Sequence, residues 1–164
     1  MANMAQEYAD GIKESLQAWD WVSTAWTEAQ DHEDTIRMAD IWLRWQIRHA
    51  DTPTARKLAA LAVDEVADLG GFDFIEEHGG PGMAWAYGTL DAYAITHVRP
   101  GQDPDVRYVE FVVGLGGPNA YVRQGDGCSE ILVYWGSDTG RAWADCEAVD
   151  DAAEAMTDAV SYGF

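Results

Sequence analysis

Closely spaced carboxylates near the C-terminus could form one binding surface. Six acidic residues and no basic residue lie in this stretch: Asp145, Glu147, Asp150, Asp151, Glu154 and Asp158. On a helix, residues three or four positions apart lie on one face, about 5–6 Å from each other. That spacing is of the same order as the distance between phosphates along a DNA strand. A helix over 147–160 would therefore hold a rigid row of negative charge that could occupy the DNA-binding groove of a basic protein.

Aromatic residues just before this helix could complete such an interface. Removing many carboxylates from water costs free energy, so we expect the acids to form a wet rim around an aromatic anchor. The candidates for the anchor are Tyr134, Trp135 and Trp143. The alternative is that the acidic helix is only a solvated outer surface over a sheet.

The sequence contains few residues in patterns that indicate catalysis, phosphate binding or metal binding. The stretch 114–118 is rich in glycine but lacks the spacing of a phosphate-binding or dinucleotide-binding loop. Four scattered histidines and the separated Cys128 and Cys146 form no zinc-binding pattern. Glu76, Glu77 and His78 could act as acids and bases, although charged residues beside a glycine loop are ordinarily solvated. We therefore expect a non-enzymatic protein with no metal and no cofactor.

The overall charge limits the kind of partner. The chain has 164 residues, of which 48% are hydrophobic, and 29 acids against ten bases give a formal net charge of −19. Such a surface repels nucleic acids and anionic membranes, so we expect a basic or DNA-binding protein as partner and no direct contact with nucleic acid. The acidity could instead serve solubility or reflect the composition of a salt-rich or high-GC host. No export signal or membrane-spanning run is present, which predicts a cytoplasmic protein with free cysteines.

Two short motifs carry a resemblance to a known group of proteins. Gly116, Gly117, Pro118 and Asn119 precede a strand, and a later strand ends in Tyr134, Trp135 and Gly136. Over residues 90–143 this pattern resembles small, uncharacterised acidic proteins of phages and mobile elements. The resemblance implies a mobile-element protein that interferes with a host system, and no catalytic residue comes with it. Combined with the acidic row, it predicts an inhibitor of a host defence enzyme that handles nucleic acid, of the anti-restriction or anti-CRISPR type.

Two other functions remain open at this point. A ligand-binding domain or small enzyme could have its pocket where the Gly-Gly-Pro corner, Asn119 and the pair Tyr134–Trp135 approach the loop at 78–82. An accessory protein could instead form a homodimer through exposed tryptophans of its helices. Trp19 and Trp26 are seven residues apart on one helical stripe and are expected in the core.

Helical periodicity and capping residues predict three helices in the first 71 residues. The first covers about 4–30, the second begins near Asp31, and the third begins at Thr52 and Pro53 and ends at Gly70. The arginines of the second helix are expected to pair with acids of the first or third helix; these are Arg37, Arg44 and Arg48.

An antiparallel sheet is predicted over residues 83–144. Apolar and β-branched runs at 90–98, 106–114, 119–123, 130–135 and 141–144 are separated by turn residues, including the corner at Gly116–Asn119. We therefore predict one α+β domain over residues 1–164. In it, the N-terminal helices and the C-terminal helix pack on one face of a four- or five-stranded antiparallel sheet.

Overall fold

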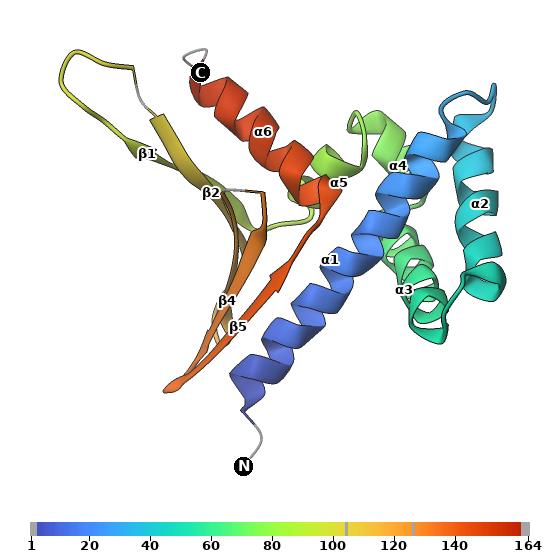
Figure 1. Ribbon diagram of the computed structural model, residues 1–164, viewed down its shortest axis with the longest axis horizontal. Helices are drawn as coiled ribbons and strands as arrows, with labels where there is room; N and C mark the ends of the chain where they lie inside the picture. The colour runs from blue at the N-terminus through green and yellow to red at the C-terminus, as the bar shows by residue number, and fades with distance from the viewer. Residues whose placement is uncertain (1–2, 104, 126, 162–164) are drawn as a thin grey trace.

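Six helices and five strands follow one another in the computed structural model, which describes residues 3–103, 105–125 and 127–161 (Figure 1). The helical elements are α1 (Met4–Ala29), α2 (Thr35–His49), α3 (Pro53–Leu69), α4 (Phe72–Glu77), α5 (Pro81–Tyr87) and α6 (Glu147–Ser161). The strands are β1 (Asp91–His97), β2 (Asp105–Gly114), β3 (Asn119–Gln124), β4 (Ser129–Trp135) and β5 (Asp138–Ala144). Among the described residues, no helix is long and apolar enough to cross a membrane.

The five strands form an antiparallel meander in chain order, β1-β2-β3-β4-β5. Side chains alternate between the two faces, and the register gives the rows that cross the sheet. One row on the buried face runs Ala92, Phe111, Val122, Ile131 and Ala142. We call the opposite side of the sheet the open face.

Helices α1 and α6 both lie on the buried face (Figure 1). Helix α1 runs along β5 and β4, whereas α6 packs beside β2 and on α5. The predicted α+β arrangement, with helices on one face of an antiparallel sheet, is therefore confirmed. The structure adds an outer layer, because α2 and α3 pack on α1 and on each other rather than on the sheet.

The helix ends follow local capping chemistry. Asn3 accepts a hydrogen bond from the backbone of Gln6, and Thr52 accepts one from Ala55 in front of α3. Gly70 ends α3 with φ of 108°, a left-handed conformation that favours glycine. The predicted cap of the second helix was three residues too early, since Asp34 rather than Asp31 accepts from the backbone of Arg37.

The segment between α3 and the sheet differs from the prediction. The sheet was expected from residue 83, but residues 81–87 form α5 and the first strand begins at Asp91. Pro81 favours the first turn of a helix, whereas the first strand predicted, at 90–98, is present as β1. Strand β5 begins at Asp138, three residues earlier than predicted.

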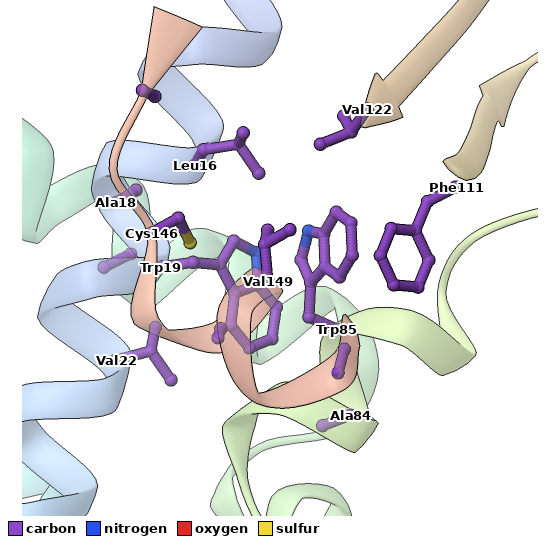
Figure 2. Close-up of a cluster of buried hydrophobic side chains, with 14 of the residues drawn as sticks. Leu16, Ala18, Trp19, Val22, Ala84, Trp85, Phe111, Val122, Cys146 and Val149 are labelled. Atoms are coloured by element: carbon purple, nitrogen blue, oxygen red, sulfur yellow. The ribbon is translucent and has the colours of Figure 1, made fainter. Parts of the chain in front are cut away.

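Aromatic side chains from three elements fill the centre of the core (Figure 2). Trp19 comes from α1, Trp85 from α5 and Phe111 from β2. The Trp85 and Phe111 rings meet edge to face with their centroids 4.9 Å apart, an arrangement that aromatic pairs favour. Val149 brings the first turn of α6 into the same cluster. The expectation that Trp19 lies in the core is confirmed.

Helix α1 approaches the backbone of the edge strand β5 very closely. A Cβ atom at Gly140 would overlap the carbonyl group of Ala5. Beside it, the Gln6 side-chain amide donates to the Arg141 carbonyl at 2.9 Å, and the Arg141 N–H donates to Gln6 Oε1 at 3.1 Å. Gln6 thereby satisfies two backbone groups on the outer edge of the sheet, which would otherwise be open to another strand.

We expect Gly140→Ala to lower the free energy of unfolding by about 1–3 kcal/mol or more, because the added methyl group must push α1 away from β5. Gly11→Ala is the matched control within α1, since no atom lies within 4 Å of the added carbon. It should raise stability by about 0.5–1 kcal/mol through helix propensity. Urea denaturation followed by circular dichroism measures both. Equal stability of the two variants would contradict the close α1–β5 contact.

Candidate functional site

The predicted row of carboxylates is present on α6. All five acidic side chains of the helix are exposed, and they fall within an arc of about 100° around its axis; they are Glu147, Asp150, Asp151, Glu154 and Asp158. The opposite side carries Val149, Ala152 and Ala153, which are buried. From first to last, the carboxylates extend over about 16 Å of a straight helix. We call this surface the acidic stripe.

Few of the described carboxylates are neutralised by a basic side chain. The described residues contain three ion pairs: Arg44–Asp40, Lys57–Glu14 and Arg123–Glu110. None of them includes an acid of α6. Within the part of the chain that the structure describes, no basic side chain therefore neutralises the acidic stripe.

The pairing expected for the arginines of the second helix is wrong. Arg44 contacts Asp40 on its own helix at 3.0 Å, and neither Arg37 nor Arg48 joins an ion pair among the described residues. These arginines point outward on α2, together with the exposed Trp45. The outer surface of α2 is thus basic and aromatic, in contrast to α6.

Asp20 connects the acidic stripe to α1. Its Oδ1 accepts a hydrogen bond from the Glu147 N–H at 2.9 Å, so a residue of α1 caps the N-terminus of α6. Burial raises the pKa of Asp20; this hydrogen bond lowers it, and the charges of Glu147, Asp150 and Asp145 raise it. The fold therefore holds a carboxylate at a position where its ionisation is disfavoured.

Asp150 has a similar environment at the side of the stripe. Burial raises its pKa, and the charges of Asp151, Asp145 and Glu147 raise it further, whereas a hydrogen bond with Gln124 lowers it. Asp150 thus lies on the side of the stripe nearest the sheet, where it lines a hollow together with Val109 and Gln124. Glu154 and Asp158 are exposed farther along the helix, toward its C-terminal end.

The predicted aromatic anchors do not lie in the centre of the acids. The Trp135 ring meets that of Tyr8 on α1, with centroids 6.3 Å apart and nearly perpendicular planes. Tyr134 and Trp143 are exposed on the open face, on the other side of the sheet from α6. Asp145 follows Trp143 by two residues and lies beside Cys128, whose pKa is raised by burial and by the charge of Asp145. The structure thus divides the predicted interface between two surfaces.

The Gly-Gly-Pro corner forms the turn between β2 and β3. Gly116 and Gly117 have φ of 93° and 103°, which glycine adopts without strain. Asn119 Oδ1 accepts a hydrogen bond from the Gly116 N–H at 3.1 Å and closes the turn. The residues of the corner, including Pro118, thus fit their place in a tight turn between two strands.

The structure does not assemble the pocket predicted at this corner. The adjoining Gly114 lies near Tyr8, whereas Gly80 lies near Trp26. These two positions of α1 are about 27 Å apart along the helix axis. His78 instead stacks on Phe74, with ring centroids 3.9 Å apart. A hollow of about 300 Å³ occurs elsewhere, between α1, α3, α5 and β2, and its lining includes neither the corner nor the 78–82 loop.

The cysteines show no sign of reactive or metal-binding chemistry. Both are free, as expected. Burial raises the pKa of Cys146 to about 12, so its thiol stays protonated and packs as an apolar group. Within residues 3–103, 105–125 and 127–161, no group of three or more His, Cys, Asp or Glu side chains could hold a metal ion.

Apart from Tyr134 and Trp143, the residues of the open face were not singled out by the sequence. One row across the strands contains Tyr93, Glu110, Arg123, Glu130 and Trp143. The guanidinium of Arg123 lies over the ring of Tyr108 at 5.2 Å, and that of Arg141 lies 5.9 Å from the centroid of the Trp143 ring. Period-two alternation predicts such a face for each strand, but only the register brings these side chains into one surface.

Comparisons with known proteins found no match for this chain: no family model, no curated protein and no solved structure is similar to it. The function is therefore argued from the residues themselves.

We expect Asp20→Asn to be at least as stable as the wild type at pH 7, because it retains the oxygen that caps α6 and removes a disfavoured charge. Asp20→Ala removes the same charge and the cap, and should be about 1 kcal/mol less stable than Asp20→Asn. Thermal unfolding of both variants in one buffer measures this difference. Equal melting temperatures would argue against a capping role for Asp20.

Lowering the pH from 7 toward 5 should raise the melting temperature of the wild type. Asp20 and Asp150 have raised pKa values, so the folded state binds more protons than the unfolded chain. The resulting stabilisation is complete below the unfolded pKa of about 3.8–3.9 and is lost as the pH rises through the raised folded values. Asp20→Asn should show a smaller rise. A melting temperature that falls steadily from pH 7 to 5 would contradict this assignment.

Proposed function

We propose that this protein is a non-enzymatic interaction protein, whose acidic stripe binds the nucleic-acid-binding groove of a basic protein in place of DNA. The observation that carries the proposal is the one-sided row of exposed carboxylates on α6, none of which is in an ion pair with a described basic residue. With the phage or mobile-element context that the sequence resemblance implies, the partner would be a host defence enzyme of the restriction or CRISPR type.

The position of the stripe supports this use. Helix α6 is fixed at its N-terminus by Asp20 and anchored in the core by Val149, so its charges are held in a defined line. Preorganised charge loses little conformational entropy on binding, and a row of one sign attracts an oppositely charged groove from a distance. This attraction would act at the encounter, before any close contact forms.

The net charge of the whole chain supports the same class of partner. At −19, the protein favours approach to a basic surface and opposes approach to nucleic acid. Binding to such a partner should weaken as ionic strength rises, since exposed charges more than about 10 Å apart are largely screened at 0.1 M salt.

The test compares two double variants with the same net charge. Glu154→Lys with Asp158→Lys reverses the exposed end of the stripe, and Glu28→Lys with Glu33→Lys reverses two exposed acids near the α1–α2 connection. DNA cleavage by a purified type II restriction endonuclease and by a guide-loaded Cas9 is measured with increasing protein. The wild type should inhibit at low salt, and the stripe variant should need at least about tenfold more protein, a loss of about 1.4 kcal/mol.

The control variant should inhibit almost as well as the wild type, because its stripe is intact. Equal loss in both variants would show that net charge alone matters. Absence of inhibition of either enzyme at 50 mM salt would remove the proposed targets. Circular dichroism confirms that each variant is folded before its activity is compared.

A further inference from the structure

A hollow of about 300 Å³ lies between α1, α3, α5 and β2. Pockets that bind small molecules have volumes from about 300 to 1,000 Å³, so this hollow has room for a small organic ligand. Among the described residues, its lining takes none from α6. The hollow is therefore separate from the acidic stripe.

The inner part of the hollow is apolar and aromatic. Leu16, Trp19 and Trp85 line it, and only 1%, 3% and 8% of their respective surfaces are exposed. Figure 2 shows these three side chains close to the centre of the core. Indole rings present a large apolar area, and the negative charge of their faces attracts cations. This floor therefore suits the apolar part of a ligand and tolerates a positive charge beside it.

Two carboxylates line the hollow from α3. Glu65 is half-buried and Asp68 is exposed, and their spacing of three residues places them on the same side of the helix. Ser15 Oγ donates a hydrogen bond to Glu65 Oε1 at 2.7 Å and thereby orients this carboxylate. An ionised carboxylate can accept about four hydrogen bonds, so most of the capacity of Glu65 is left for a ligand.

No described basic side chain lines the hollow, and none forms an ion pair with Glu65 or Asp68. An anionic ligand, such as a phosphate or a carboxylate, would meet two like charges there. The formal net charge of −19 acts in the same direction, because it attracts cations to the protein and repels anions. The lining is therefore complementary to an organic cation that also carries an apolar group.

We propose that this hollow binds a small primary amine that carries an aromatic group. The aromatic group packs on Leu16, Trp19 and Trp85, and the ammonium group donates hydrogen bonds to Glu65 and Asp68. A primary ammonium has three N–H donors, enough for both carboxylates. The site goes beyond the proposed function, since it uses other elements and requires no protein partner.

Four small probes test the chemical class by isothermal titration calorimetry with the full chain at pH 7 and 50 mM salt. We expect 2-phenylethylamine to bind with a dissociation constant of about 1 mM or lower. Three analogues should bind at least about tenfold more weakly, because 2-phenylethanol lacks the charge, 3-phenylpropanoate reverses it and methylamine lacks the ring. Binding of the alcohol or the propanoate as tight as that of the amine overturns the proposal, and so does an amine that does not bind at 20 mM.

The tryptophan indole signals in ¹⁵N–¹H NMR spectra locate the bound amine. The signals of Trp19 and Trp85 should shift during titration with 2-phenylethylamine. The signal of Trp45, which is 55% exposed on α2, should stay in place. Single Trp→Phe variants assign the three signals. Shifts at Trp45 without shifts at Trp19 and Trp85 would place the binding on another surface and overturn the proposal.

Charge-removing variants of α3 test the carboxylates. Asp68→Asn should weaken amine binding about threefold and Glu65→Gln about tenfold, because Glu65 is the more buried of the two. Asp64→Asn is the matched control: it removes one charge from the same helix, and Asp64 is exposed and does not line the hollow. Its affinity should equal that of the wild type.

Thermal unfolding shows whether each variant is folded. Asp68 is exposed, so its substitution tests the site even if Glu65→Gln loses stability with the hydrogen bond from Ser15. Unchanged affinity in both Asp68→Asn and Glu65→Gln overturns the proposal. Equal weakening in Asp64→Asn also overturns it, because the amine would then be held only by general attraction to an acidic protein. All three variants leave α6 intact, so the outcome does not depend on whether the acidic stripe binds a partner.

Discussion

The contact between α1 and β5 is the constraint on which the rest of the structure depends. Helix α1 lies between the sheet and the pair α2–α3, so its distance from β5 sets the position of the outer layer. Gly140 permits that distance, because any larger residue would meet the backbone of Ala5. Gln6 fixes the position of α1 along β5, because its side chain bonds to both the backbone N–H and the backbone carbonyl of Arg141. One contact thus packs α1 on the sheet and covers the outer edge of β5.

The same helix also positions the charge of the molecule. Through Asp20, α1 caps α6 and brings a further carboxylate beside the acidic stripe. Burial and the neighbouring acids disfavour the ionised form of Asp20, whereas the hydrogen bond favours it. The apolar side of α6, with Val149, Ala152 and Ala153, supplies the burial that holds the helix in place despite this repulsion.

Two surfaces of different character result, on opposite sides of the sheet. The helical side carries the acidic stripe, and the open face carries both acids and arginines together with tyrosines and Trp143. A strongly charged surface favours rapid encounter with an oppositely charged partner, whereas an aromatic surface favours close, desolvated contact.

The sequence by itself determined the four long helices, an antiparallel sheet of four or five strands and the acidic side of α6, because these depend on local periodicity, on caps such as Thr52 and on turn residues such as Gly116. It misplaced the start of the sheet, where Pro81 begins a short helix. Only the tertiary structure decided that Trp135 turns toward α1 while Trp143 faces away from α6. The physical reason is that neighbouring strand residues point to opposite faces, and which face is covered depends on contacts between segments far apart in the chain.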